Sequence, residues 1–278
     1  MTPLGFTLTI FFISIGAGLL GSLLGLGGGI IVVPALTLLF KVDIRYAIGA
    51  SIISIIATSS GAAAAYVRER MTNLRVAMLL EVATTAGALT GAWLSGTLRP
   101  QWLFIIFGLM LACSAVGMFR GRREKASSNV PPDPLADRLG LHNVFHDEAT
   151  GREVRYRVTH TRLGLALMVV AGIASGLLGI GAGILKVPTM DLAMRLPIKV
   201  STATSNFMIG VTAAASAGFY FARGDVNPFI AAPVAAGILV GATLGSRLLG
   251  RLHGSLIRAI FVIVLVWASI QMILKGLK

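Results

Sequence analysis

The chain has 278 residues, of which 55% are hydrophobic and 13% are charged, and its mean hydropathy is +0.84. A soluble domain of this size needs about a quarter of its residues charged to cover its surface, so this composition excludes a water-soluble protein. The formal net charge of +13 does not indicate nucleic-acid binding. Basic residues of membrane proteins collect in loops beside anionic lipid headgroups, and no nucleic-acid-binding signature accompanies the charge. We therefore expect the lipid bilayer, and no nucleic acid, as a partner.

Apolar runs come in two batches separated by a polar stretch. Crossing a bilayer takes about 20 mostly apolar residues. The first batch comprises Leu4 to Leu26, Ile30 to Phe40, Ala47 to Val67, Leu74 to Leu98 and Leu103 to Phe119. The second comprises Leu163 to Ile180, Ile184 to Met194, Val200 to Phe221, Phe229 to Leu249 and Leu256 to Leu274. This pattern predicts an all-α polytopic membrane protein with about eight transmembrane segments. Its parts are a first repeat over 1–120, a linker over 121–160 and a second repeat over 161–278.

The two batches are copies of one unit. Shifting the chain against itself by 154 positions pairs residues 17–34 with residues 171–188, and ten of those eighteen pairs are identical. The same shift superposes Ser51 on Ser205, and Tyr66 on Tyr220. An internal duplication in a polytopic membrane protein is typical of a transporter built from two repeats, with its site between them.

Each copy contains a glycine cluster, at residues 25–29 and 179–183, followed by an apolar run of about eleven residues that is too short to cross a bilayer. We expect a broken or re-entrant helix there, beginning near Ile30 or Ile184, with Pro34 and Pro188 near its first turns. Free backbone N–H groups and the positive end of the helix dipole would attract an anion. The substrate-binding residues predicted on this basis are Gly27, Gly28, Gly29, Ile30, Gly181, Ala182, Gly183 and Ile184. The alternative is that the glycines only permit close packing, as Gly87 and Gly91 are expected to do.

Lys186 is the only Lys or Arg well inside an apolar run, and the repeat places it opposite Val32. An intramembrane cation is costly, which favours a substrate-binding role; the alternative is that it snorkels to the interface. Polar residues on the next helix could add neutral contacts to substrate or could simply join helices. They are Ser51, Thr204, Ser205 and Asn206. Glu81 is a candidate proton-coupling carboxylate if it faces the bundle interior, or an interfacial residue near Arg75.

The polar linker and its flanks are strongly basic, which places the linker in the cytoplasm. Alternating residues from Val144 to Val158 around a turn at residues 148–151 predict a β-hairpin within it. If each broken helix makes no net crossing, the repeats are inverted and 17 basic residues lie inside against 6 outside. If it does cross, the repeats are parallel and the counts are 15 and 8. The inverted arrangement is favoured. Hydrolase, metalloprotease and phosphate-loop motifs are absent, so we predict no enzyme, no cofactor and no metal.

The two glycine clusters, each followed by proline and duplicated around a hydrophilic middle loop, resemble the TauE/SafE (TSUP) family of sulfite exporters. The most specific segments are residues 25–34 and 179–188, and Ala182 departs from the pattern where a third glycine would be expected. The resemblance covers nearly the whole chain outside 121–160. It implies secondary transport of sulfite, organosulfonates or related small anions across a bacterial inner membrane.

These observations predict an inner-membrane secondary transporter that exports a small sulfur-containing anion by alternating access. A small anionic substrate and a coupling proton are the expected partners, and no oligomeric state is predicted. Two other hypotheses remain open: an anion channel on the same scaffold, and a non-transporting membrane scaffold or sensor that binds a partner through the hairpin.

Overall fold

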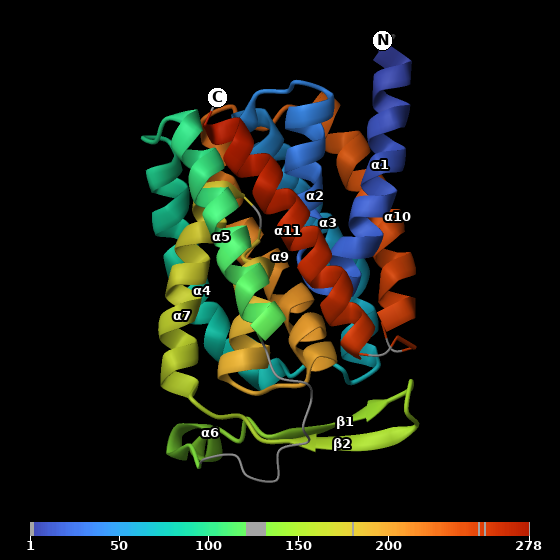
Figure 1. Cartoon of the computed structure of the whole chain (residues 1–278), viewed down its shortest axis with the longest axis vertical. Helices are drawn as coiled ribbons and strands as arrows, with labels where there is room; N and C mark the ends of the chain where they lie inside the picture. The colour runs from blue at the N-terminus through green and yellow to red at the C-terminus, as the bar shows by residue number, and fades with distance from the viewer. Residues whose placement is uncertain (1–2, 121–131, 180, 250, 253, 278) are drawn as a thin grey trace.

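The computed structural model describes residues 3–120, 132–179, 181–249, 251–252 and 254–277, and most of them are helical (Figure 1). The first repeat comprises α1 (Pro3–Leu24), α2 (Gly29–Pro34), the π-helix η1 (Ala35–Leu39), α3 (Ile44–Arg68), α4 (Leu74–Ser95) and α5 (Pro100–Arg120). The second comprises α7 (Thr161–Leu178), α8 (Gly183–Pro188), η2 (Thr189–Ala193), α9 (Ile198–Ala222), α10 (Pro228–Leu249) and α11 (Gly254–Gly276). Between them lie α6 (Pro134–Arg138), β1 (Asn143–Asp147) and β2 (Arg152–Tyr156). Linker residues 121–131 and Ile180 lie outside the described residues.

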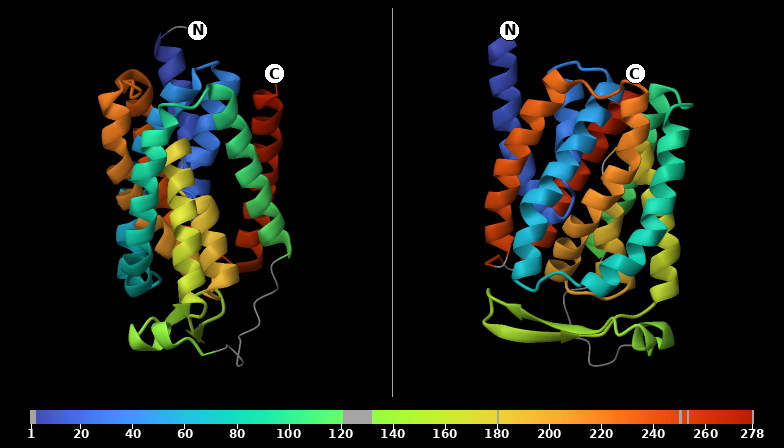
Figure 2. Two further views of the ribbon diagram at one scale, coloured as in Figure 1. Left: turned by 90° about the vertical axis from the view of Figure 1, so that its left-hand side faces the viewer. Right: turned by 180° about the vertical axis from the view of Figure 1, so that it is seen from behind.

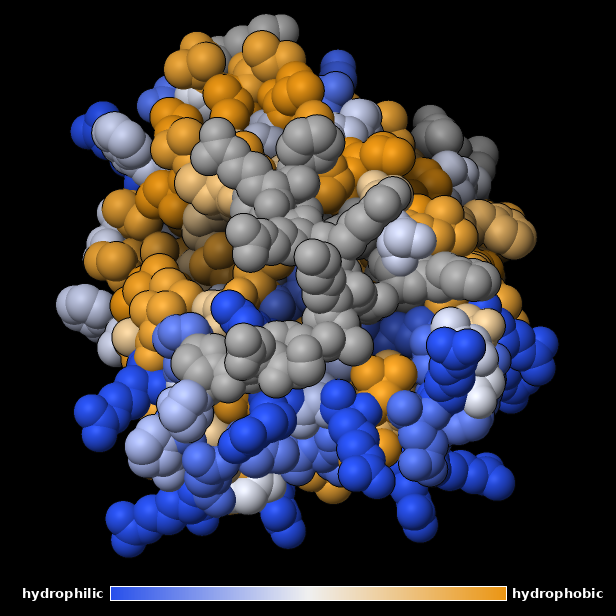
Figure 3. Space-filling model, turned by 60° about the horizontal axis from the view of Figure 1, so that its bottom comes forward, coloured by the Kyte–Doolittle hydropathy of each residue, from blue (hydrophilic) through white to orange (hydrophobic). Residues whose placement is uncertain are grey.

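The long helices form one bundle suited to a bilayer. Five of the described helices, α1, α3, α4, α7 and α10, are long and apolar enough to cross a membrane. Helices α5, α9 and α11 run beside them, which gives the expected eight long segments. In Figure 3, hydrophobic side chains cover the flank of the molecule and hydrophilic ones gather at the end that carries the hairpin. The expectation of an all-α polytopic membrane protein is therefore confirmed.

The two repeats have opposite orientations. α1 starts at the end of the molecule farthest from the β-hairpin, whereas α7 starts beside the hairpin (Figures 1 and 2). Each broken helix then returns to the end where its repeat began. In the first repeat, the rings of Phe6 and Phe40 lie 5.2 Å apart, centroid to centroid. In the second, the Thr159 N–H donates to the Met194 carbonyl at 3.2 Å. Neither broken helix makes a net crossing, so the favoured inverted arrangement is the observed one.

Helices from opposite repeats pack at backbone distance. α1 lies along α10, and α7 lies along α4. A Cβ added to Gly18 would lie 2.4 Å from the Ile238 carbonyl oxygen, and one added to Gly172 would lie 2.1 Å from that of Thr84. These two contacts are related by the 154-residue shift. The glycines therefore let inverted copies cross closely, as small residues do at helix interfaces in membranes.

The short helices bend where proline interrupts their hydrogen bonding. Pro34 is the sixth residue of α2, not part of its first turn as expected from the sequence, and the π-helix η1 follows it directly. Pro188 occupies the same place before η2. Proline lacks an N–H and its ring crowds the carbonyl four residues earlier, so a wider turn relieves the clash.

The hairpin closes one end of the bundle. β1 and β2 pair antiparallel, with Phe145 opposite Val154. Asp147, at the end of β1, accepts a hydrogen bond of 2.5 Å from Lys199, which lies in the first turn of α9 and is buried. Burial acts to raise the pKa of Asp147, but the hydrogen bond and positive charge of Lys199 outweigh it and hold that pKa below its usual range. The hairpin carboxylate is therefore ionised at neutral pH and tied to the membrane helices.

Close helix crossing makes glycine necessary at Gly91. A Cβ there would lie 2.0 Å from the Ile173 carbonyl oxygen. We expect Gly91→Ala to destabilise the protein by about 1–3 kcal/mol, because backbone cannot move aside as a side chain can. Gly16→Ala is the matched control, since nothing lies within 4 Å of a Cβ on that residue of α1. Thermal unfolding in detergent checks both, and equal midpoints for the two variants would contradict the packing.

Candidate functional site

Two glycine loops break the helices inside the bundle, and both follow the same backbone path. Gly27 and Gly28 have φ angles of 76° and 71°, and Gly181 and Ala182 have φ angles of 75° and 58°. These left-handed conformations turn the chain so that a new helix starts at residue 29 or 183, one residue before the predicted starts. Gly28 and Ala182 are the N-caps of α2 and α8. The predicted broken helices are thus present in both copies.

Ala182 takes a left-handed angle that favours glycine, and its surroundings explain why alanine fits there. A Cβ on the equivalent residue, Gly28, would lie 2.6 Å from Cδ1 of Ile238. The 154-residue shift relates Ile238 to Thr84, which is smaller and has no Cδ1. The second copy therefore has room for the methyl group that the first copy excludes, at the cost of a strained backbone angle.

The loops meet each other at the centre of the bundle. A Cβ added to Gly183 would lie 2.2 Å from the Gly25 carbonyl oxygen. Ile30 and Ile184, at the starts of the two short helices, are fully buried. The structure therefore brings together the predicted residues of both loops, and in this conformation they are packed against protein. The residues concerned are Gly27, Gly28, Gly29, Ile30, Gly181, Ala182, Gly183 and Ile184.

The predicted serines hold the loop of the opposite repeat. Ser51 of α3 donates to the Gly179 carbonyl, and Ser205 of α9 donates to the Gly25 carbonyl, each at 2.7 Å. The two bonds are related by the 154-residue shift. Backbone carbonyls freed by a helix break need such partners inside a membrane, where no water is at hand. Ser51 and Ser205 are therefore bound to loop backbone in this conformation.

The other two predicted polar residues of α9 lie apart from each other. Asn206 donates from Nδ2 to the Ser22 carbonyl at 2.6 Å, while its Oδ1 is buried and has no hydrogen-bond partner in the described part of the chain. Thr204 instead accepts from the Asn73 N–H at 3.0 Å, at the α3–α4 connection. Asn206 thus adjoins the first glycine loop, whereas Thr204 faces the hairpin end.

Lys186 and Glu81 form one buried site. The Lys186 ammonium on α8 donates to Glu81 Oε2 on α4 at 3.1 Å and to Thr212 Oγ1 on α9 at 2.6 Å. Thr212 in turn donates to Glu81 Oε1 at 2.5 Å. Lys186 is fully buried and Glu81 is 8% exposed. Lys186 therefore does not snorkel to the interface, and Glu81 faces the bundle interior and not Arg75.

Two further hydroxyl groups complete the carboxylate's surroundings. Thr84 donates to Glu81 Oε2 at 3.1 Å and Thr85 donates to Oε1 at 3.2 Å. Among the described residues, the contacts that stabilise the Glu81 charge thus come from one cation and three hydroxyls, on three different helices. A buried pair of this kind is tolerated only while both partners are present, because an unpaired charge in a low-dielectric interior is costly.

The charged site is built from both repeats, with Glu81 in the first and Lys186 in the second, and it has no symmetry-related copy among the described residues. The residues related to Lys186 and Glu81 are Val32 and Ala235, and the residue related to Thr212 is Thr58. Thr58 donates instead to the Gly27 carbonyl at 3.1 Å. Sequence reasoning treated Lys186 and Glu81 separately and did not identify Thr212 as their bridge. The available signal was that the internal cation Lys186 and the internal anion Glu81 are each replaced by an apolar residue in the other copy.

Comparison with known proteins agrees with this architecture. The model of the family "Sulfite exporter TauE/SafE" matches residues 10–272, which include both glycine loops and the charged site. The chain belongs to this family. It is similar to the probable membrane transporter protein YunE of Bacillus subtilis, with 29% identity over 94% of this chain and 95% of that protein. It is also similar to a probable membrane transporter protein of Xylella fastidiosa, with 27% identity over 73% of this chain and 71% of that protein.

A more distant relative is the probable membrane transporter protein MJ0441 of Methanocaldococcus jannaschii, with 25% identity over 70% of this chain and 65% of that protein. No solved structure shows a significant match to the chain. The TauE/SafE family and the relatives' names make this chain a multi-pass membrane transporter protein. Within this TauE/SafE protein, the Lys186–Glu81–Thr212 site and the two glycine loops are the candidate transport machinery.

The ion pair predicts a specific pattern of stability in this TauE/SafE protein. Lys186→Met and Glu81→Leu should each lower the free energy of unfolding by about 3–5 kcal/mol, because each leaves the partner's charge buried and unpaired. The double variant should recover most of that loss, since neither charge remains. Thermal unfolding of the four proteins in detergent checks this. A double variant no more stable than the weaker single variant would contradict direct pairing.

Proposed function

We propose that this protein is a secondary transporter of a small sulfur-containing anion, sulfite or an organosulfonate, which it exports across the inner membrane by alternating access. The observation that carries the proposal is the pair of inverted repeats whose glycine loops meet beside one buried cation. Inverted repeats with discontinuous helices are the architecture in which one repeat rocks against the other around a central site. The anion chemistry comes from Lys186 and the two short-helix N-termini.

The orientation that we propose places the hairpin end in the cytoplasm. Basic side chains at that end include Arg68, Arg70, Arg75, Arg138, Arg152, Arg155, Arg157 and Arg162. Lys and Arg are enriched in the cytoplasmic loops of membrane proteins. Substrate leaving the cell would then enter from the hairpin side and leave at the side where α3 begins.

The Lys186 ammonium can bind an anionic substrate, but in this conformation it is paired with the Glu81 carboxylate. We propose that substrate and Glu81 compete for the Lys186 ammonium. When the Glu81 carboxylate takes up a proton it no longer needs the cation, so an anion can replace it at no net cost in buried charge. Proton and anion would then move together, one of each per cycle, so export would be driven by a higher anion concentration inside the cell and not by the inward proton gradient. Within the described residues, Lys186 is the charged group that contacts Glu81. The other contacts of the Glu81 carboxylate are the hydroxyls of Thr84, Thr85 and Thr212.

Transport itself is tested by flux in proteoliposomes. We expect saturable uptake of sulfite or an organosulfonate by the wild-type protein, and loss of at least about 90% of it in Lys186→Met, because a neutral side chain cannot hold an anion in a low-dielectric site. Lys41→Met is the matched control, since Lys41 is an exposed residue before α3. Undiminished flux in Lys186→Met would remove the proposed role of this residue. Conductance that does not saturate would indicate a channel instead of a carrier.

Proton coupling is tested in the same vesicles with a pH gradient. We expect acid on the side of the anion to drive accumulation by the wild-type protein. Glu81→Gln should keep exchange of labelled for unlabelled anion but lose the response to the pH gradient, because the glutamine amide does not take up a proton near neutral pH. Thr85→Val, which removes a hydroxyl contact but leaves the carboxylate, is the control. Accumulation that still follows the gradient in Glu81→Gln would exclude Glu81 as the coupling group.

A further inference from the structure

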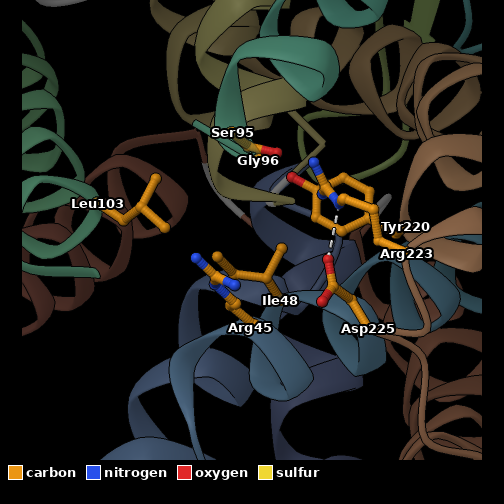
Figure 4. A pocket seen from close by; sticks show the side chains of 8 residues that line it. All are labelled: Arg45, Ile48, Ser95, Gly96, Leu103, Tyr220, Arg223 and Asp225. Carbon is orange, nitrogen blue, oxygen red and sulfur yellow. Dashed lines mark hydrogen bonds and ion pairs between the residues drawn. The ribbon is translucent and has the colours of Figure 1, made fainter. Parts of the chain in front are cut away.

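A cavity of about 240 Å³ lies at the end of the molecule opposite the hairpin. It opens between the start of α3, the end of α4 and the end of α9 (Figure 4). The residues that matter for its chemistry are Arg45, Ile48, Ser95, Tyr220, Arg223 and Asp225. None of them belongs to the Lys186–Glu81–Thr212 site. Two guanidinium groups against one carboxylate leave the walls with an excess of positive charge.

One of the two guanidinium groups is already held in place. Arg223 donates from Nε to Asp225 Oδ2 at 2.9 Å and from Nη1 to the Ala92 carbonyl at 3.0 Å. Its guanidinium carbon lies 4.5 Å from the centre of the Tyr220 ring. Arg223 is therefore a fixed wall whose charge is balanced by Asp225 (Figure 4).

The charge of Arg45 has no such balance. Its backbone N–H is capped by Asp43 Oδ1 at 2.8 Å, but within the described part of the chain no carboxylate pairs with its guanidinium. Arg45 is the second residue of α3, where free backbone N–H groups and the helix dipole add to the positive potential. The excess positive charge of the cavity is therefore that of Arg45.

The inner wall of the cavity reaches the second glycine loop. The side chain of Ile48 lies 2.5 Å from the place that a Cβ on Gly179 would take. The Tyr220 hydroxyl donates to the Gly176 carbonyl at 2.5 Å, near the end of α7. Beyond this loop lies α8, which carries Lys186. A ligand in the cavity is thus separated from the glycine loop by Ile48 and Tyr220.

The inverted repeat supplies an independent indication of what Arg45 binds. The 154-residue shift relates Arg45 to Lys199, at the start of α9 and at the opposite end of the bundle. Lys199 holds a carboxylate there, Asp147 of the hairpin, at 2.5 Å. This position is therefore basic in both repeats. In the second repeat the basic side chain, Lys199, binds a carboxylate, which is an oxyanion. In the described part of the chain, no carboxylate is paired with the Arg45 guanidinium.

We propose that this cavity binds a small oxyanion, such as a sulfonate, sulfite or carboxylate, on Arg45, and that it is the mouth of the transport path at the end opposite the hairpin. Arg223 and Tyr220 form its fixed wall. At the other mouth, the equivalent place beside Lys199 is filled by the hairpin's own carboxylate. That the bound oxyanion is the transported substrate rests on the proposed function; that the cavity binds an oxyanion does not.

Calorimetric titration of the purified protein with methanesulfonate tests the proposal without transport. We expect saturable binding by the wild-type protein, weakened about tenfold or more in Arg45→Gln, because a charge-assisted hydrogen bond is lost. Arg45→Lys should keep most of the affinity, since the charge remains. Arg99→Gln is the matched control: Arg99 is exposed at the same end but does not line the cavity. Tetramethylammonium, a cation of similar size, should not bind.

Two results would overturn the proposal: no saturable binding of methanesulfonate by the wild-type protein, or equal affinities for wild type and Arg45→Gln. Equal thermal unfolding midpoints for wild type and Arg45→Gln would show that a loss of binding is not a loss of fold. Binding that depends on Arg45 in a protein that moves no anion in vesicles would support the cavity and contradict the proposed transport. Anion flux in vesicles, together with an affinity for methanesulfonate that Arg45→Gln does not change, would support the proposed transport and contradict the proposed cavity site.

Discussion

Two stretches of non-helical backbone need hydrogen-bond partners for their polar groups inside a lipid bilayer, and the rest of the structure follows from that constraint. Irregular backbone is tolerated at membrane depth only where protein covers it. Here each glycine loop is covered by the other repeat. Ser205 donates to the first loop and Ser51 donates to the second, and the loops touch at Gly25 and Gly183. A single copy would leave its loop carbonyls without these partners, which is a physical reason for the duplication.

On this symmetric frame the chemistry is asymmetric. Gly179 packs against Ile48 of α3, and the equivalent Gly25 packs against Thr202 of α9. The buried Thr202 hydroxyl and Asn206 Oδ1 have no hydrogen-bond partners among the described residues. The charged pair likewise occurs only once: Lys186 of the second repeat meets Glu81 of the first, and the residues related to them by the shift, Val32 and Ala235, are apolar. The two halves are therefore alike in backbone path and differ in the polar and charged side chains at the centre.

The two ends of the bundle also differ although they are related by the repeat. Arg45 lines an open cavity at one end. Its counterpart Lys199 is buried and paired with Asp147 at the other end. The carboxylate comes from the hairpin in the middle linker, between the two repeats. Alternating access needs one end closed while the other is open. In the alternating access that we propose, a hairpin tied to α9 by this ion pair would close one end.

The sequence by itself determined the membrane class, the duplication, the positions of both helix breaks and the hairpin, because each depends on a local pattern or on self-similarity. The charge count favoured the inverted arrangement only narrowly, and the contact between Phe6 and Phe40 decided it, since a short apolar run does not tell which end it returns to. Only the tertiary structure showed that Glu81 contacts Lys186, 105 positions away, and that Thr204 lies toward the hairpin end and not beside the glycine loops. The physical reason is that these helices are apolar nearly all round, so sequence gives no amphipathic signal for the face on which a lone polar side chain lies. Which polar side chains meet is decided by how the helices pack.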